Sequence, residues 1–221
     1  MVFQGFVTVA VIVTLNALQI SSQCPECLTK THPQDAFCQD DFVIRTTITD
    51  MKETGDDPTT PEIDPKTSYK IDIVKVFKEP AVPSIEATCI ASSLSGNATV
   101  GCFFSLHALN ASLPCGVELE VDSLQEYLIS GTVEDGKMII DACSLAIPWE
   151  EVTGHMKIGL NKRYKKNCQC ETGEDKCIVE PPEDELCFCQ YATCVEVKKV
   201  GCAPVCKWKK SKTFKTCLGS A

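Results

Sequence analysis

The amino-acid sequence predicts a mainly β fold in two parts, and three observations lead to this prediction. Short segments rich in β-branched and aromatic residues recur between residues 42 and 140, with turn-forming residues between them. The chain has 16 cysteines among its 221 residues, a density typical of a disulfide scaffold. From Cys168 onwards the cysteines crowd together with little apolar sequence between them. A first domain with its own apolar core should therefore precede a small domain that depends on disulfides.

The N-terminal segment has the composition of a signal peptide. Residues 1–23 contain no charged side chain, and Phe6–Ile20 is an almost continuous apolar run. Asn16 and Gln19 interrupt the run, which favours a cleaved signal peptide over a membrane anchor and makes Cys24 the first mature residue. No comparable run follows, so we expect no membrane span after cleavage, and a secreted, extracellular protein with paired cysteines.

Six segments of the first domain have the composition of strands, and several alternate apolar and polar residues as a half-buried strand does. Strands of this length and spacing suit a sandwich or a small barrel, and we favour the barrel. Asp135-Gly136 lies between the last two segments and predicts a tight hairpin turn. The expected strands are Phe42–Ile48, Tyr69–Phe77, Ile85–Ala91, Thr99–Leu106, Glu126–Val133 and Lys137–Ile140.

Other segments predict a loop, a helix and two modification sites. Asp50–Lys66 is rich in Asp, Thr and Pro, so we expect an exposed connection between two strands. Pro148–Arg163 should be helical, with Pro148 near its start and apolar residues along one face. Asn97 and Asn110 each begin an Asn-x-Ser/Thr sequence and are expected glycosylation sites of an exported protein.

Charge is distributed unevenly along the chain. The net charge of −9 disfavours a nucleic-acid partner. Most charged residues between 171 and 185 are acidic, whereas residues 198–215 contain seven lysines. We favour a solvated lysine face for this basic C-terminal tail, and the alternative is a patch that binds matrix glycans.

The reactive side chains predict that the protein is not an enzyme. The three histidines, His32, His107 and His155, form no spaced metal-binding or triad motif, and we expect no catalytic residue. His32 is expected to be a hydrogen-bonded turn residue. The Cys-x-x-Cys pair of Cys24 and Cys27 has the spacing of a redox or zinc motif, but an oxidising compartment favours structural disulfides.

A series of motifs resembles, in order, the blocks of the tissue inhibitor of metalloproteinases family. The motifs are CPEC (24–27), HPQDAFC (32–38), VIR (43–45), CGV (115–117), EYLISG (126–131), DGKM (135–138), PW (148–149), LN (160–161), RY (163–164) and CQC (168–170). The resemblance covers Cys24 to Cys170. The remaining residues, 171–221, resemble the family only as a short cysteine-rich tail.

The resemblance implies an architecture and a set of disulfides. Residues 24–168 should form a netrin-like module, a five-stranded barrel of the oligonucleotide/oligosaccharide-binding type with flanking helices. Residues 169–221 should form a small disulfide-rich C-terminal subdomain that holds eight cysteines. The implied pairs are Cys24–Cys115, Cys27–Cys143 and Cys38–Cys168. Cys89 and Cys102 are additions to the family pattern in adjacent expected strands, and we propose that they pair with each other.

The resemblance also implies that the protein inhibits extracellular zinc metalloproteinases. A catalytic zinc has three protein ligands and one open position, which holds the reactive water. The α-amine and carbonyl oxygen of mature Cys24 would chelate the zinc of the target protease, so the inhibitor needs no cofactor of its own. The protease-binding residues would be a first strip of Cys24, Pro25, Glu26 and Cys27 and a second strip of Ser112 and Leu113.

The expected strips depart from the family pattern. The chain opens with Cys-x-x-Cys where the family has Cys-x-Cys, and one more residue is added between Cys27 and His32. The side chain at the protease's specificity pocket would then be Pro25, which has no N–H, or Glu26, whose unpaired burial costs several kcal/mol. The alternative function is therefore a non-inhibitory structural or interaction module of the extracellular matrix on the same fold.

Overall fold

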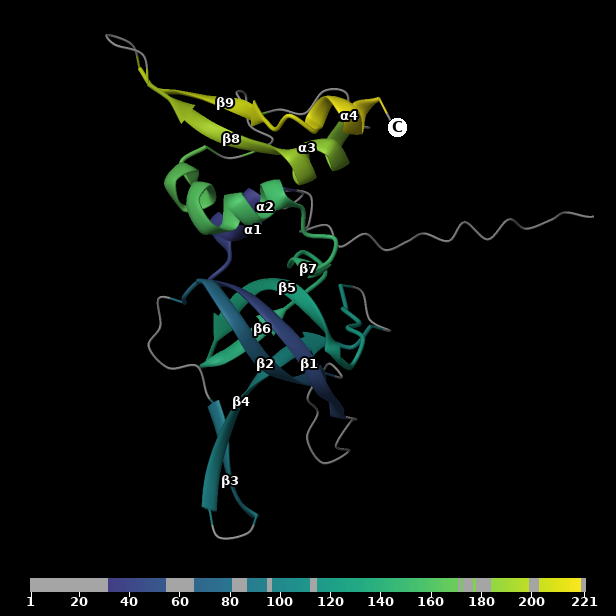
Figure 1. Ribbon diagram of the computed structural model, residues 1–221. Coiled ribbons are helices and arrows are strands. Elements are labelled where there is room, and N and C mark those ends of the chain that lie inside the picture. The colour runs from purple at the N-terminus through teal and green to yellow at the C-terminus, as the bar shows by residue number, and fades with distance from the viewer. Residues whose placement is uncertain are drawn as a thin grey trace, which may run out of the picture.

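The computed structural model describes residues 32–54, 66–80, 87–94, 97–111, 115–170, 172, 177, 184–198 and 203–219, with the backbone alone at 54, 66, 87–94, 97–103 and 123. The expected signal peptide and the first strip, Cys24 to Cys27, lie outside the described residues. Ser112 and Leu113 also lie outside them. The structure has two bodies, a β-barrel and a helical layer topped by a β-hairpin (Figure 1). The first helix of the layer, α1 Pro33–Gln39, precedes the barrel in the chain, and the rest of the layer and the hairpin follow it.

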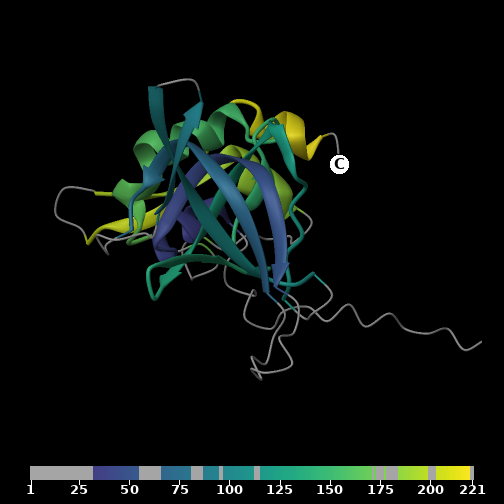
Figure 2. The ribbon, with the colours of Figure 1, turned by 90° about the horizontal axis from the view of Figure 1, so that it is seen from below.

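Five strands close the barrel, as the sequence predicts. The hydrogen-bonded order is β1-β2-β4-β6-β5, and β5 returns to pair with β1. The pairs are antiparallel except β4 with β6, which are parallel. In the view from below, the barrel lies in front of the helices and the C-terminal hairpin (Figure 2). The strands are β1 Phe42–Thr54, β2 Lys66–Lys78, β4 Asn97–Leu109, β5 Asp122–Glu134 and β6 Lys137–Ile140.

Bulges bend the first two strands around the barrel. The register of β1 against β2 skips Thr49 on β1 and Val74 and Phe77 on β2. Each extra residue increases the local twist and bends its strand, which helps a small sheet to close. The enclosed core is a cluster of buried apolar side chains from all five strands, including Phe42, Ile48, Ile71, Leu106, Ile129 and Met138.

All six expected strands are present. β1, β2, β4 and β5 are longer than predicted, β6 has the predicted bounds, and the strand expected at Ile85–Ala91 is found at residues 87–94. Asp135 and Gly136 have φ values of 50° and 79°, which is the left-handed pair of a tight hairpin turn between β5 and β6. Because β1 continues to Thr54, the loop expected from Asp50 starts later, and residues 55–65 lie outside the described ranges. Two additional strands flank the barrel: β3 Ala87–Leu94 pairs with β4, and the unpredicted β7 Ala146–Pro148 pairs with β5.

The helix expected from Pro148 to Arg163 starts later than predicted. Pro148 ends β7 opposite Tyr127, since a short edge strand tolerates a residue without an N–H. Thr153 caps the helix instead, and its hydroxyl accepts the Met156 N–H at 3.2 Å. The helical layer consists of α1 Pro33–Gln39, α2 Gly154–Ile158, the π-helix η2 Gly159–Arg163 and the 3₁₀-helix η3 Tyr164–Asn167. The apolar face expected for this segment is buried against α1 in a second cluster of apolar side chains. Val152, Met156 and Leu160 contribute from the segment, Tyr164 contributes from η3, and Ala36 and Phe37 contribute from α1.

The C-terminal part has a small apolar core and several disulfides. A cluster around Cys187, Phe188, Ala192 and Phe214 is its main apolar contact. Among the described residues of this part, three disulfides join cysteines of the eight assigned to it: Cys170–Cys206, Cys177–Cys194 and Cys187–Cys217. Its elements are α3 Glu185–Tyr191, β8 Ala192–Val197, β9 Val205–Lys210 and α4 Phe214–Leu218, and β8 and β9 form an antiparallel hairpin.

A membrane-spanning helix requires a long apolar segment. None of the helices in the described ranges has the length and apolarity for such a span.

Candidate functional site

Cys115 and Cys143 lie next to each other at one end of the barrel. The parallel strands β4 and β6 pair Ala108 with Ile140, so the chain leaves both strands at the same end. Cys115 follows β4 and Cys143 follows β6, and the Ala142 N–H donates to the Cys115 carbonyl at 3.1 Å. Both cysteines are disulfide-bonded. Their expected partners, Cys24 and Cys27, lie outside the described residues.

A tight loop leads from β4 to Cys115. The Val117 N–H donates to the Leu109 carbonyl at 3.2 Å and closes the base of the loop. A Cβ on Gly116 would lie 2.0 Å from the Asn110 carbonyl oxygen, so this close approach requires glycine. Cys115 has a φ of 66° and turns the chain back towards the barrel. The second expected strip, Ser112 and Leu113, lies in the sequence of this loop, between Ala111, which is exposed, and Cys115.

Tyr69 of β2 holds the chain that follows Cys115. Its side chain is 1% exposed, and its hydroxyl donates to the Val117 carbonyl at 3.3 Å and accepts the Leu119 N–H at 3.1 Å. Burial raises the pKa of Tyr69, so the hydroxyl keeps its proton at neutral pH and remains a donor. Sequence reasoning did not find this role, because nothing local to a strand tyrosine marks the loop that it meets.

Asp141 shapes the turn that presents Cys143. The Asp141 carboxylate accepts the Cys143 N–H at 2.9 Å, and the Ser144 N–H donates to the Asp141 carbonyl at 3.0 Å. An aspartate that binds the amide two residues ahead forms an Asx turn. Asp141 was not among the predicted site residues, although an aspartate directly after a predicted strand could have indicated the turn.

His32 caps α1 and lies against the C-terminal part. Its Nδ1 accepts the Gln34 N–H at 3.0 Å, and its Nε2 lies 3.2 Å from the Phe188 carbonyl. A carbonyl can only accept, so Nε2 carries the proton of the neutral ring. Burial lowers the pKa of His32 to about 4, which keeps the ring neutral at physiological pH. His32 is therefore the hydrogen-bonded N-cap of α1.

Gln34 and a disulfide fix the rest of α1. The Gln34 amide nitrogen lies 3.0 Å from the carbonyls of Asn167, Cys170 and Cys194, and its oxygen accepts the Cys194 N–H at 3.0 Å. The structure also contains a disulfide between Cys38 and Cys168, the pair implied by the resemblance. The helix is thus attached both to η3 and to β8.

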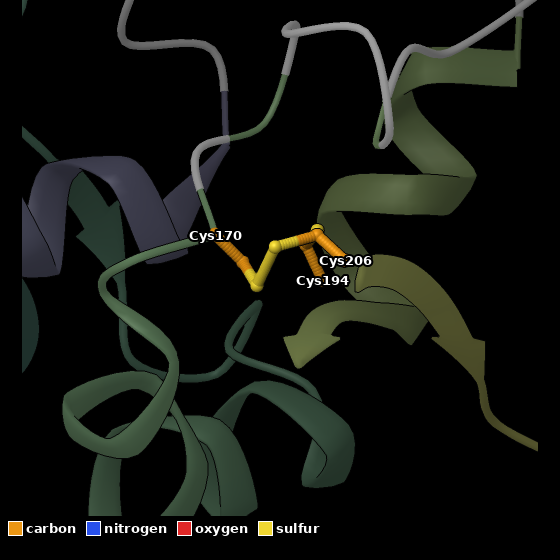
Figure 3. Close-up of side chains that lie close together, drawn as sticks. All are labelled: Cys170, Cys194 and Cys206. Carbon is orange, nitrogen blue, oxygen red and sulfur yellow. A yellow bond between two sulfur atoms is a disulfide. The ribbon is translucent and has the colours of Figure 1, made fainter. Parts of the chain in front are cut away.

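Three cysteine sulfurs of the C-terminal part lie as close together as metal ligands. Those of Cys170, Cys194 and Cys206 lie within 4.8 Å of one another (Figure 3). All three cysteines are in disulfides, Cys170–Cys206 and Cys177–Cys194, and a disulfide sulfur is not the thiolate that binds zinc. The group is therefore a pair of adjacent disulfides and not a metal site.

Cys89 and Cys102, the proposed additional pair, lie directly opposite each other in the β3–β4 ladder. Directly opposite residues of antiparallel strands have Cα atoms about 4.5–5.5 Å apart, which is within the range of disulfides. Their side chains are not described, so the bond itself remains a proposal.

Comparison with known proteins identifies similar sequences over most of the chain. Residues 22–218 match the protein family described as "Tissue inhibitor of metalloproteinase". The chain is 36% identical over 161 residues to "Metalloproteinase inhibitor 2" of Homo sapiens, a match that covers 70% of this chain and 64% of the human protein. It is 36% identical to the Cricetulus longicaudatus protein of the same name, with 70% and 72% covered. It is 28% identical over 172 residues to "Metalloproteinase inhibitor 3" of Scyliorhinus torazame, with 77% and 70% covered.

Proposed function

The chain belongs to the tissue inhibitor of metalloproteinase family, and from this premise we propose that it is a secreted inhibitor of zinc metalloproteinases. The proposed contact is a chelate, in which the α-amine and carbonyl oxygen of mature Cys24 occupy the open position of the protease zinc and displace its water. An α-amine has a pKa near 8, so it loses its proton easily when zinc competes for the nitrogen.

The observation that carries the proposal is the adjacency of the disulfide-bonded Cys115 and Cys143. Disulfides from these two positions to Cys24 and Cys27 would hold the N-terminus at two neighbouring points of the barrel end. A strip held in this way loses little conformational freedom when it docks, which favours tight binding. Four residues separate Cys27 from the fixed His32, so Cys27 lies within about 17 Å of it.

The second strip would lie on the same side of the barrel. Ser112 and Leu113 belong to the loop that is closed at Val117 and fixed by Gly116, and this loop ends at Cys115 itself. The two strips would then share an anchor, the proposed Cys24–Cys115 disulfide. A glycan on Asn110 would lie beside this surface, whereas Asn97 is at the far end of the 13-residue β4.

Pro25 and Glu26 would determine which proteases are bound. A carboxylate at Glu26 that enters an apolar specificity pocket without a partner costs several kcal/mol, whereas a basic side chain in the pocket would pair with it. We therefore expect inhibition to be strongest for metalloproteinases that have a basic group in that pocket.

The test compares the mature protein with a variant that carries one additional alanine ahead of Cys24. Mass spectrometry first establishes that the secreted protein starts at Cys24. The inhibition constant is then measured on a metalloproteinase panel that contains members with basic and with apolar specificity pockets. The added residue should weaken inhibition at least about a hundredfold, or ~2.7 kcal/mol, because the chelating amine is no longer at Cys24.

An alanine added after Ala221 is the matched control and should change nothing. Equal inhibition by the N-terminally extended variant would refute the chelate. A correctly processed, folded protein that is inert towards every panel member would refute inhibition itself and favour the matrix-module alternative.

A further inference from the structure

The hairpin of β3 and β4 extends beyond the barrel. Strand β4 pairs with β2 from Phe104 to Leu109, whereas its first residues, 97–103, pair only with β3 among the described strands. β3 and residues 97–103 therefore form a two-stranded arm, which we call the β3–β4 arm. It projects from the barrel on the side away from the helical layer and the C-terminal part (Figure 1). The candidate site lies beyond the other end of β4, where the chain leaves Leu109 towards Cys115.

Both outer edges of the β3–β4 arm lack a neighbouring strand within the described ranges. β3 pairs with β4 over its whole length and with no other described strand. The pairing of β2 with β4 stops at Ile71 and Phe104, so no described strand lies along residues 97–103 on that side. A two-stranded ribbon alone is marginally stable in water, and the unpaired N–H and C=O groups of its edges can pair with a further strand. The arm is therefore incomplete as a sheet.

The edge of β3 has none of the features that usually protect an edge strand. Proteins protect such edges with charged side chains, proline or β-bulges. The sequence contains no Asp, Glu, Lys or Arg between residues 86 and 118, and no proline in residues 87–103. The β3–β4 pairing runs without a register shift, whereas the β1–β2 pairing has three shifts. The edge of β3 is thus regular, uncharged and able to accept another strand.

We propose that β3 of one copy of the protein pairs antiparallel with β3 of a second copy. The contact is isologous, because the same strand supplies both halves about a two-fold axis. The product is a four-stranded sheet in the order β4-β3-β3-β4, which has the three or more strands that an independent sheet needs. With Ile90 on the axis, residues 87–93 of the two copies face each other over about 24 Å, and Thr88 lies opposite Ser92 of the second copy.

Charge favours a second copy as the occupant of this edge. A partner strand recognised by its charge would find no opposite charge on β3, whereas a second copy brings an equally uncharged strand. The net charge of −9 makes two copies repel each other, and a contact between the arms opposes none of these charges directly. The expected glycosylation site Asn97 is in β4 and not in the paired strand.

The test measures the molar mass of the full-length secreted protein by sedimentation equilibrium over a wide range of concentration. Wild type should approach twice the monomer mass at high concentration. Two variants place like charges opposite each other, Thr88→Lys/Ser92→Lys and Thr88→Glu/Ser92→Glu. Each should raise the dimer dissociation constant at least about tenfold, because like charges directly opposite destabilise a strand pair. An equimolar mixture of the two variants should dimerise at least as tightly as wild type, because opposite charges then pair.

The matched control, Gln169→Lys/Thr216→Lys, adds the same charge at exposed positions outside the arm and should dimerise like wild type. A wild-type protein that stays monomeric at every concentration would refute the proposal. Dimers that the charges at Thr88 and Ser92 leave unaffected would place the contact elsewhere, and a mixture that stays monomeric would contradict the strand pairing. Protease inhibition, measured per monomer, should be equal in all variants, so failure of this proposal is distinguishable from failure of the proposed function.

Discussion

Buried polar residues at the start of α1 connect parts of the chain that are far apart in sequence. Gln34 is fully buried and contacts backbone groups that lie 133 to 160 positions away. His32 contacts Phe188, 156 positions away, and lies 5.1 Å from the Trp208 ring. The contacts satisfy the polar atoms of these two buried side chains, and a buried polar group left without a partner costs about 1–3 kcal/mol. These two residues therefore attach the C-terminal part to the barrel domain.

The depressed pKa of His32 makes stability dependent on pH. The neutral ring is favoured in the folded protein, with a pKa of about 4 against 6.5 in the unfolded chain. Its contribution is complete above pH 6.5 and is lost as pH falls from 6.5 to about 4, a total of about 3 kcal/mol. Urea unfolding of wild type and His32→Asn at pH 7 and pH 4.5 measures this loss. Asparagine keeps an acceptor for the helix cap but does not titrate.

The difference in unfolding free energy between the two proteins should therefore shrink, or reverse, at the lower pH. Acid titration of the carboxylates is common to both and cancels in the comparison. A difference that stays constant between the two pH values would contradict the prediction.

The arrangement of β4 and β6 brings the candidate site together. Because β4 and β6 are parallel, the loops that follow them start at the same end of the sheet. The loops that contain Cys115 and Cys143 therefore meet, although the two cysteines are distant in sequence. β2 contributes Tyr69, which attaches the segment after Cys115 to the barrel. The site is therefore a property of three neighbouring strands and not of any single motif.

Replacement of Tyr69 by phenylalanine should loosen this segment without unfolding the barrel. The change leaves the Leu119 N–H without its acceptor, at a cost of about 1–2 kcal/mol. The Leu119 amide should then exchange with solvent roughly tenfold faster or more. Hydrogen exchange followed by nuclear magnetic resonance measures the exchange rate of the Leu119 amide, and the amide of the buried Ile129 in β5 serves as the internal reference. Equal acceleration at both amides would indicate global destabilisation and contradict the local role.

The whole molecule depends on disulfides that close loops of very different length. Cys38–Cys168 joins α1 to the C-cap of η3 across 130 residues, whereas Cys177–Cys194 spans 17 residues within the C-terminal part. In the chain-entropy account, a crosslink stabilises by restricting the unfolded chain, and the effect grows with the logarithm of the loop length. The long-range disulfide should therefore contribute more than the local one.

Removal of the long-range disulfide should cost more stability than removal of the local one. The variant Cys38→Ala/Cys168→Ala should lose about 5 kcal/mol, and Cys177→Ala/Cys194→Ala about 3 kcal/mol. Chemical unfolding of the two variants and the wild type measures both losses. A larger loss for the local pair would show that native packing around it, and not chain entropy, determines its contribution.

Local patterns in the sequence determined the class of the fold and most of its strands. The alternation of apolar residues, the Asp135-Gly136 turn and the cysteine density each depend on neighbouring residues, and the structure confirms the closed five-stranded barrel that they and the family resemblance predict. The helix start was wrong because Pro148 suits either a helix start or an edge strand, and only its pairing with Tyr127 distinguishes the two.

The tertiary structure alone decided which distant residues meet. The proximity of Cys115 and Cys143, the hydroxyl of Tyr69 beneath the Cys115 loop and the contacts of Gln34 all join segments far apart in sequence. Such contacts depend on how the strands pair and wind, which is determined by the packing of the whole core and is not encoded in any short segment.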